Sequence, residues 1–289
     1  MAARPRTLPA AIAPVLVGSA AAWAAFGDAS ELFSWGNFVA ALVGAVFIQI
    51  GTNLANDYSD AKRGADTVDR LGPVRVTAAG LVAPKRVLHA TWIAFGIAAL
   101  AGLYLVTRVG PEILVIGILS IAAGVLYTGG PKPYGYEGLG EVFVFVFFGL
   151  VAVNGSYYVQ LEDLQTLPVL LSIPIGLLSA AILVVNNVRD IDTDRRAGKR
   201  TLAVRIGRER SRELYVAMIV ASYVLLPVAL AAGDGSGWGL LGLLSLPLAA
   251  APVRAVRERA DGPALNGALA GTGALLGAYA LLVSVGLLI

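Results

Sequence analysis

The chain has 289 residues, of which 57% are hydrophobic and only 14% charged, and its mean hydropathy is +0.75. Ordinary soluble domains carry about 25% charged residues, so this composition excludes a soluble globular fold. The chain has no cysteine, which excludes a disulfide, a thiolate metal site and a cysteine nucleophile. Its single histidine, His89, argues against imidazole metal clusters and Ser-His-Asp chemistry and is expected to be structural.

Apolar segments long enough to cross a bilayer as helices, about 20 residues each, recur along the whole chain. In chain order they cover residues 8–26, 37–55, 87–107, 110–128, 141–160, 168–187, 213–232, 238–256 and 264–287. Only Arg108 to Gly110 join the third segment to the fourth, which predicts a tight hairpin. We therefore expect an all-α, polytopic membrane protein with about nine transmembrane helices, in which residues 1–289 form a single integral-membrane domain.

The basic residues predict the orientation of these helices. If the N-terminus is cytoplasmic, Arg108 alone lies outside, and the basic residues inside are Arg4, Arg6, Lys132 and those of loops 62–86, 189–212 and 254–259. This one-sided distribution follows the positive-inside rule, and an odd number of spans puts the C-terminus outside. The net charge of +3 is then a by-product of topology. It predicts no nucleic-acid partner, and no protein partner is evident.

Two acidic motifs follow the second and sixth predicted spans, both on the cytoplasmic side. They are NLANDYSDAKRGAD, residues 53–66, and NNVRDIDTDRRAGKR, residues 186–200. If each continues as a helix, Asn and Asp side chains three or four residues apart line one face. The residues on these faces are Asn53, Asn56, Asp57 and Asp60 in the first motif and Asn186, Asn187, Asp190 and Asp194 in the second. Polar side chains at membrane depth usually face a cavity or a partner.

Carboxylates at this spacing on two facing helices suit a hard divalent cation. Mg²⁺ is commonly held by one or two carboxylates together with substrate phosphates. Four negative charges in a half-buried site also require compensation by cations. We therefore predict that Asp57, Asp60, Asp190 and Asp194 bind magnesium. The alternative, solvated loop carboxylates that pair with nearby Lys and Arg, is preferred for Asp69, Asp192, Glu209 and Glu213.

The two motifs resemble the aspartate-rich motifs of the UbiA superfamily of intramembrane aromatic prenyltransferases. Within it they are most similar to the 1,4-dihydroxy-2-naphthoate polyprenyltransferases of menaquinone synthesis. The supporting stretches are RPRTLPAAIAPVLVG from Arg4, DRLGPVRVTAAGLV from Asp69 and YTGGPKPYGYEGLGE from Tyr127. One departure is visible: the pattern N-D-x-x-D-x-x-x-D would place its last acid at Gly64, whereas the third carboxylate here is Asp66.

The resemblance implies transfer of a polyprenyl group from an allylic polyprenyl diphosphate to 1,4-dihydroxy-2-naphthoate. Diphosphate and carbon dioxide would leave, and demethylmenaquinol would form. The resemblance also implies a central cavity open to the cytoplasmic side. The bias for arginine over lysine, with abundant alanine and glycine, indicates a GC-rich bacterial genome, and in a bacterium the location would be the plasma membrane. Magnesium would bind at the four catalytic aspartates, and the diphosphate would contact Asn56, Asn187, Lys132 and Arg189. Further basic candidates are Arg70, Arg75, Lys199 and Arg200.

Other polar residues are candidates for the substrate cavity, namely Asn53, Asp66, Tyr127, Tyr134, Asn154 and Tyr157. The sequence identifies no catalytic base. Glycines of the second to fourth spans predict close helix packing, with a groove for the prenyl tail as the alternative. These glycines are Gly44, Gly51, Gly96, Gly102, Gly117 and Gly124.

Three rival functions differ in chemistry or in class. A prenyltransferase acting on 4-hydroxybenzoate, homogentisate or a chlorin would use the same metal and diphosphate groups. A cation or lipid transporter would place its acids near the bilayer midplane, usually within an internal repeat, whereas here they lie at one face. A CDP-alcohol phosphotransferase would carry the signature D-G-x-x-A-R, which is missing.

Overall fold

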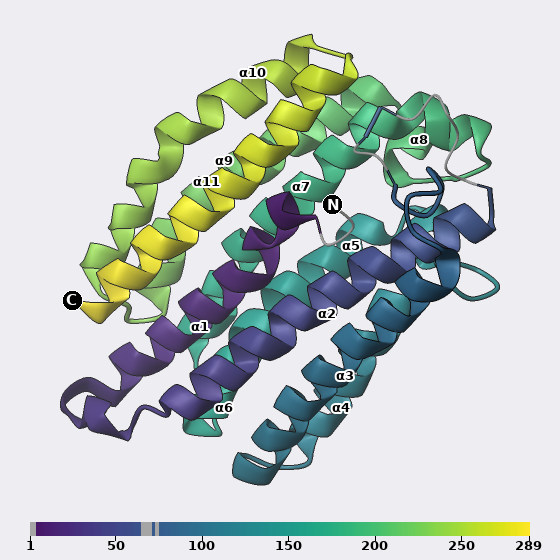
Figure 1. The fold of residues 1–289 in the computed structure, drawn as a ribbon. Coiled ribbons are helices and arrows are strands. Elements are labelled where there is room, and N and C mark those ends of the chain that lie inside the picture. Colours follow the sequence, from purple (N-terminus) through teal and green to yellow (C-terminus); the bar gives the residue numbers. More distant parts are fainter. Residues whose placement is uncertain (1–3, 65–70, 73–74) are drawn as a thin grey trace.

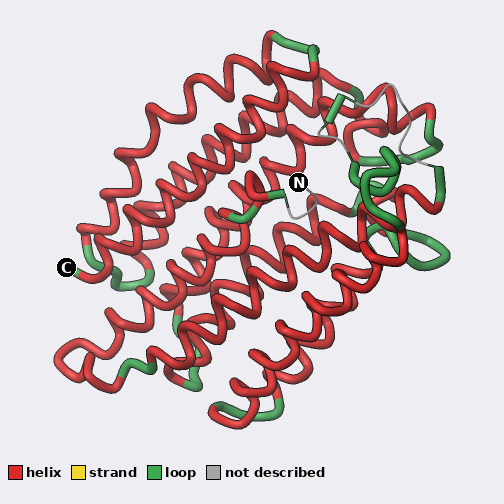
Figure 2. Tube along the Cα trace, in the orientation of Figure 1, coloured by secondary structure: helices red, strands yellow, loops and turns green. Residues whose placement is uncertain are grey.

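The computed structural model describes residues 4–64, 71–72 and 75–289. Helices lie side by side along one bundle axis, as Figure 1 shows, and Figure 2 shows loops and short turns between them. The C-terminal ends of α2 (Trp35–Lys62) and α7 (Thr166–Arg196) lie at the same end of the bundle, and the C-terminus of the chain lies at the other (Figure 1). The bundle therefore brings the two acidic motifs to one end.

The first half of the chain forms two helical pairs. A 3-10 turn (Pro5–Thr7) leads into α1 (Pro9–Phe26), and a second 3-10 segment (Gly27–Leu32) leads to α2. The Ser34 hydroxyl caps α2 by accepting a hydrogen bond from the Asn37 N–H at 3.2 Å. The second pair is α3 (Pro84–Arg108) and α4 (Glu112–Leu126). Three residues separate these two helices, which confirms the predicted hairpin.

The second half surrounds the longest helix, α7. A 3-10 turn, η3 (Tyr134–Glu137), precedes the fifth span, which is built from α5 (Gly140–Val144), a π-helical segment η4 (Phe145–Val151) and α6 (Ala152–Leu161). The elements after α7 are α8 (Leu202–Ile206), α9 (Arg208–Ala232), the 3-10 segment η5 (Gly237–Ala249), α10 (Ala250–Glu258) and α11 (Gly262–Leu288). α7 packs against α1, α6, α9 and α11, so it forms the centre of the bundle.

Among the described residues, eight helical segments are at least 18 residues long and apolar enough to cross a membrane. The remaining predicted span, the fourth in chain order (110–128), corresponds to α4, whose 15 residues extend for only about 22 Å. α4 is shorter than predicted because residues 109–111 are used by the hairpin and the helix ends before Gly129 and Gly130. Leucine and isoleucine side chains of α3 and α4 are exposed, as expected of a surface that faces lipid.

Glycines allow two close helix contacts in the core. A Cβ on Gly18 of α1 would collide with the Val153 carbonyl of α6, and Gly149 of η4 lies against Gly176 of α7. Gly51 of α2 also serves close packing, because an added Cβ would collide with the Phe95 ring of α3. By contrast, an added Cβ would meet no atom within 4 Å at Gly44, Gly96, Gly102 or Gly117, so these four do not serve close packing.

Candidate active site

Both acidic motifs continue as helices, as predicted. α2 extends to Lys62 and α7 to Arg196, so each motif occupies the last turns of a long helix. Their side chains are removed from solvent: Asp57 and Asp60 are each 1% exposed and Asp190 is 5% exposed. Charges this well buried must be compensated by neighbouring groups. The groups that bind each carboxylate therefore define the site.

Asp60 lies among positive charges. Its Oδ2 accepts a hydrogen bond from Arg75 Nη2 at 2.8 Å, and its Oδ1 accepts one from the Tyr136 hydroxyl. The ammonium of Lys199 lies 3.6 Å from Asp60 Oδ1 and 3.8 Å from Asp194 Oδ1. Lys199 also lies 4.7 Å above the Tyr136 ring. One buried ammonium therefore stands between the acidic motif of α2 and that of α7.

Asp57 fixes the loop that carries Arg75. Its two carboxylate oxygens accept hydrogen bonds from the backbone N–H groups of Val76, at 3.1 Å, and Thr77, at 3.0 Å. Sequence reasoning counted Asp57 as a metal ligand and did not foresee this use. Because Val76 follows Arg75 directly, these bonds hold the Arg75 guanidinium against Asp60.

Asp190 forms a buried ion pair with the preceding residue, Arg189. Arg189 Nε donates to Asp190 Oδ1 at 2.8 Å, and Arg189 Nη2 donates to Asp190 Oδ2 at 2.6 Å. The guanidinium, 1% exposed, also donates to Asn186 Oδ1 at 2.9 Å and to Asn266 Oδ1 of α11 at 2.7 Å. The Asn266 amide in turn donates to the Leu71 carbonyl at 2.9 Å. This cluster joins the second acidic motif to the last helix.

The two asparagines predicted to bind diphosphate are oriented in opposite ways. The Thr128 hydroxyl donates to Asn56 Oδ1 at 2.8 Å, so the Asn56 NH₂ group is the part that faces away from Thr128. The Asn187 NH₂ donates to Glu141 Oε1 at 2.8 Å, which leaves the Asn187 carbonyl oxygen as the acceptor it presents. Thr128 and Glu141 are both 4% exposed. They are the second and the last residue of the stretch YTGGPKPYGYEGLGE, but sequence reasoning did not select them.

Several predicted residues lie away from this cluster. Lys132 is exposed, and it forms no hydrogen bond or ion pair with the part of the chain that the structure describes. Arg200 is also exposed, although its backbone N–H donates to the Tyr136 carbonyl at 2.8 Å. Asp66, Asp69 and Arg70 lie outside the described residues. Lys199 and Arg75, which sequence reasoning could not rank above the others, both contact Asp60.

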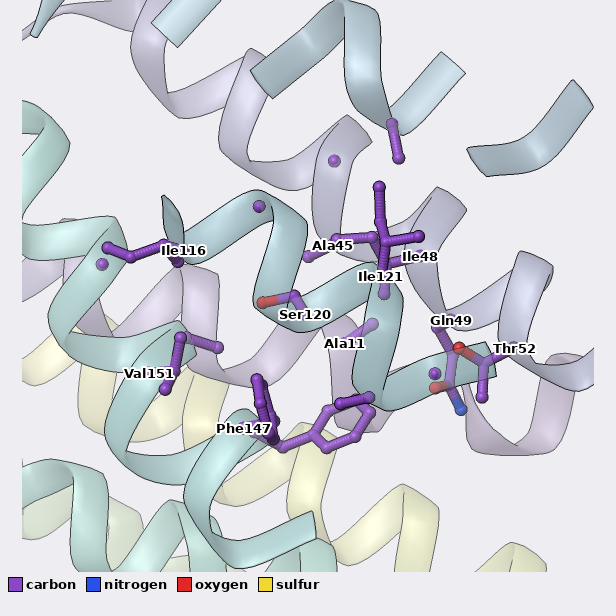
Figure 3. A pocket seen from close by; sticks show the side chains of 18 of the residues that line it. Ala11, Ala45, Ile48, Gln49, Thr52, Ile116, Ser120, Ile121, Phe147 and Val151 are labelled. Atoms are coloured by element: carbon purple, nitrogen blue, oxygen red, sulfur yellow. The ribbon is translucent and has the colours of Figure 1, made fainter. Parts of the chain in front are cut away.

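An apolar cavity of about 530 Å³ extends from the polar end into the bundle. Asn53, Asn56 and Asn186 line its polar end together with Tyr127 and Tyr134. Figure 3 shows the apolar part, where Ile121 of α4 and Phe147 and Val151 of η4 surround the same space. Gln49 and Thr52 bring polar groups from α2 (Figure 3).

The aromatic residues at the polar end form a stack. The Tyr134 ring lies 3.9 Å from that of Phe143, and the Tyr127 ring lies 5.4 Å from Tyr134 at a steep angle. The Tyr134 hydroxyl donates to the Ala123 carbonyl at 2.8 Å, and burial raises the pKa of this phenol, so it stays neutral. Asn154 and Tyr157, predicted for the cavity, are not among its lining residues.

The donor set at this end fits a hard cation. Asp60 and Asp194 present carboxylate oxygens from two helices to one positive charge, which is the Lys199 ammonium in this structure. Oxygen ligands of this kind are those that Mg²⁺ prefers. No three His, Cys, Asp or Glu side chains meet at one point among the described residues. Two of the four predicted carboxylates therefore face a shared cation, while Asp57 and Asp190 bind other groups.

The chain has clear relatives. The UbiA prenyltransferase family matches residues 11–268. The 1,4-dihydroxy-2-naphthoate octaprenyltransferase of Mycobacterium leprae (strain TN) is 44% identical over 98% of this chain and 93% of its own. The enzyme of the same name from Escherichia coli (strain K12) is 40% identical over 94% of this chain and 90% of its own. The chain belongs to the UbiA prenyltransferase family.

Solved structures share the fold. An apo structure of a UbiA homologue from Aeropyrum pernix K1 has a TM-score of 0.66 at 16% identity, covering 96% of each chain. A UbiA homologue from Archaeoglobus fulgidus, bound to DMAPP and Mg²⁺, has a TM-score of 0.61 at 14% identity, covering 98% of this chain and 97% of that one. These findings confirm the predicted all-α, multi-pass membrane fold and the resemblance to the UbiA superfamily.

Proposed function

We propose that this protein transfers a polyprenyl group from an allylic polyprenyl diphosphate to 1,4-dihydroxy-2-naphthoate. Diphosphate and carbon dioxide leave, and the product is demethylmenaquinol. The observation that carries the proposal is the charged site of Asp60, Lys199 and Asp194, which lies one helical turn of α2 beyond Asn56 at the polar end of an apolar cavity. Such a site suits a substrate with a diphosphate head and a hydrocarbon tail. The choice of acceptor is supported by the names of the relatives.

The diphosphate head is proposed to bind where the basic side chains converge. Arg75 and Lys199 supply buried positive charge, and the Asn56 NH₂ is an available hydrogen-bond donor. Charge-assisted hydrogen bonds of this kind are stronger than neutral ones. Contacts from Lys132 and Arg189 remain part of the proposal. Lys199 is the better-supported lysine because it is buried between the two motifs, whereas Lys132 is exposed.

Magnesium is proposed as the cofactor, held by Asp60 and Asp194, with Asp57 and Asp190 as further candidates. When bound, it would neutralise the charge that develops on the diphosphate as the allylic bond breaks. Lys199 and Arg75 would then be free to contact the diphosphate oxygens. Tyr136, which bonds Asp60 and lies under Lys199, would hold both groups in place.

The allylic carbon must be kept from water until the aromatic ring attacks it. Tyr127, Tyr134 and Phe143 form the aromatic stack at the polar end, and the faces of such rings attract a developing positive charge. Below them the lining is almost entirely apolar, which suits the tail and excludes water. These side chains would bind and shield the reacting carbon, while the acceptor ring supplies the attacking electrons.

The remaining proposals concern placement. The protein is proposed to lie in the bacterial plasma membrane, with its N-terminus and both acidic motifs on the cytoplasmic side. Residues 1–289 are proposed to act as one integral-membrane domain. The supporting observation is that basic loops and both motifs share one end of the bundle (Figure 1).

The test uses the purified protein in detergent with magnesium and a radiolabelled polyprenyl diphosphate. One tube receives 1,4-dihydroxy-2-naphthoate and a parallel tube 4-hydroxybenzoate, and EDTA controls accompany both. Lipid-extractable product that depends on the naphthoate and is abolished by EDTA is expected. Product with hydroxybenzoate alone would retain the reaction but replace the acceptor. No product from either, in protein shown to be folded, would overturn the proposal.

A further inference from the structure

The apolar cavity continues far below the charged site. It is lined on α2 from Asn56 back to Ala40, which is 16 residues or about 24 Å of helix. Leu105, Ile113 and Val159, which form a small buried cluster, line its far end. The cavity therefore has a definite depth, and the side chains at each level decide what fits there.

One level of the α2–α3–α4 wall is filled by a phenylalanine. A Cβ added to Gly51 of α2 would collide with the Phe95 ring of α3, and one added to Gly124 of α4 would meet Thr52 and Phe95. Phe95 is only 3% exposed. At this level the two glycines make room for an aromatic ring of the protein itself.

The next level of the same wall is open. Seven residues, or nearly two helical turns, bring each of these three helices back to the same face about 10 Å further from the charged site. The residues reached are Gly44 on α2, Gly102 on α3 and Gly117 on α4. All three line the cavity, and an added Cβ would meet no atom within 4 Å at any of them. Among the described residues, no side chain lies against these glycines as Phe95 lies against Gly51 at the level above.

We infer that this open level admits the prenyl tail, and that Gly44, Gly102 and Gly117 thereby determine which tail lengths the protein accepts. The inference rests on the proposed function and adds a specificity determinant to it. Gly44 lies 12 residues, or about 18 Å, beyond Asn56 at the charged end. An isoprene unit contributes four main-chain bonds of about 1.5 Å, so at most about 6 Å. A tail needs at least about three units to reach the glycines.

A leucine at this level should therefore discriminate between tails by length. Gly102→Leu puts four carbons into space that a long tail needs and a two-unit tail does not reach. Leucine is also a better helix former than glycine, so the helix itself is not weakened. Gly96 on the same helix provides a matched control, because it is exposed, has open space around its Cα and does not line the cavity.

The experiment measures kcat/KM with geranyl diphosphate, which has two isoprene units, and with an eight-unit polyprenyl diphosphate, using one acceptor. In Gly102→Leu, the ratio of eight-unit to two-unit kcat/KM should fall about tenfold or more, because the leucine side chain occupies space that the eight-unit tail needs. In Gly96→Leu, the ratio should stay within about twofold of the wild type. If geranyl diphosphate binds but is not converted, its affinity is measured as an inhibition constant against the eight-unit substrate, and the reciprocal of that constant takes the place of its kcat/KM in the ratio.

An unchanged ratio in Gly102→Leu would overturn the inference. Gel filtration and thermal unfolding in detergent show whether each variant is folded. If Gly102→Leu does not fold, Gly44→Leu and Gly117→Leu carry the same measurement from the other two helices, and unchanged ratios there would also refute it. Failure of the proposed function is distinguishable, because the wild type would then convert no allylic diphosphate with any acceptor.

Discussion

Lys199 stands between the two acidic motifs, so its removal gives the sharpest test of the site. We expect Lys199→Met to lower the stability of the magnesium-free protein and to increase the stabilisation that magnesium provides. Methionine keeps most of the apolar stem and removes the charge. Without the ammonium, less positive charge lies between Asp60 and Asp194, so a divalent cation should bind there more tightly.

The distances set the magnitude. Contacts of 3.6 and 3.8 Å are each worth about 4–5 kcal/mol of attraction at an effective dielectric constant of about 20. Burying the ammonium costs several kcal/mol, and Asp60 keeps its bond to Arg75. We therefore expect a net loss of about 2–3 kcal/mol, seen as a decrease in Tm of about 5 °C or more.

The assay is thermal unfolding in detergent with and without magnesium, for the wild type, Lys199→Met and the exposed control Lys85→Met. A ligand that binds the folded state raises Tm in proportion to the logarithm of its concentration over Kd, so tighter binding gives a larger increase. The magnesium-dependent increase should be larger in Lys199→Met than in the other two. Equal increases in all three proteins would refute the shared cation site.

Three further tests address other parts of the site. Asp190→Asn leaves the Arg189 charge buried without its carboxylate and should lower the free energy of unfolding by about 3–5 kcal/mol. Asp192→Asn, which breaks an exposed ion pair, should lower it by at most about 1 kcal/mol. Similar Tm values for the two variants would contradict this difference. Glu141→Leu should lower kcat about 10- to 100-fold because it releases the Asn187 amide. Glu141→Gln should lower kcat much less, because glutamine still offers the Asn187 amide an acceptor. Equal losses of kcat in steady-state kinetics would argue that Glu141 does not orient Asn187. Lys132→Ala should raise KM for the polyprenyl diphosphate less than Lys199→Met does. The opposite order would indicate that Lys132, although exposed in this structure, contacts the bound diphosphate.

Sequence reasoning located the two halves of the site because helical spacing is a local property. Asn and Asp at intervals of three and four required only that the two helices continue, and they do so to Lys62 and Arg196. Which basic residue enters the site is not local. Lys132 and Lys199 both lie in loops at the same end, and only the folded arrangement of those loops buries Lys199 beside Asp60.

The cavity lining shows a second limit of sequence reasoning. Asn154 and Tyr157 were assigned to the cavity as polar interruptions of an apolar span, but a polar residue in a span identifies a partner or a cavity without saying which. The π-helical turn Phe145–Val151 also breaks the 3.6-residue period just before them, so their direction cannot be extrapolated from the start of the span. Thr128 and Glu141 were missed because single polar residues at the ends of spans are common.

The contact between Arg189 and Asn266 has a consequence for biogenesis. A membrane protein enters the bilayer as it is synthesised, and α11 leaves the ribosome after α1 to α10. Until it inserts, the Arg189 guanidinium has no Asn266 oxygen, and Asn266 cannot donate to the Leu71 carbonyl. The end of the second acidic motif is therefore completed only after α11 has been made, so nascent chains that stop before Gly262 lack a finished site.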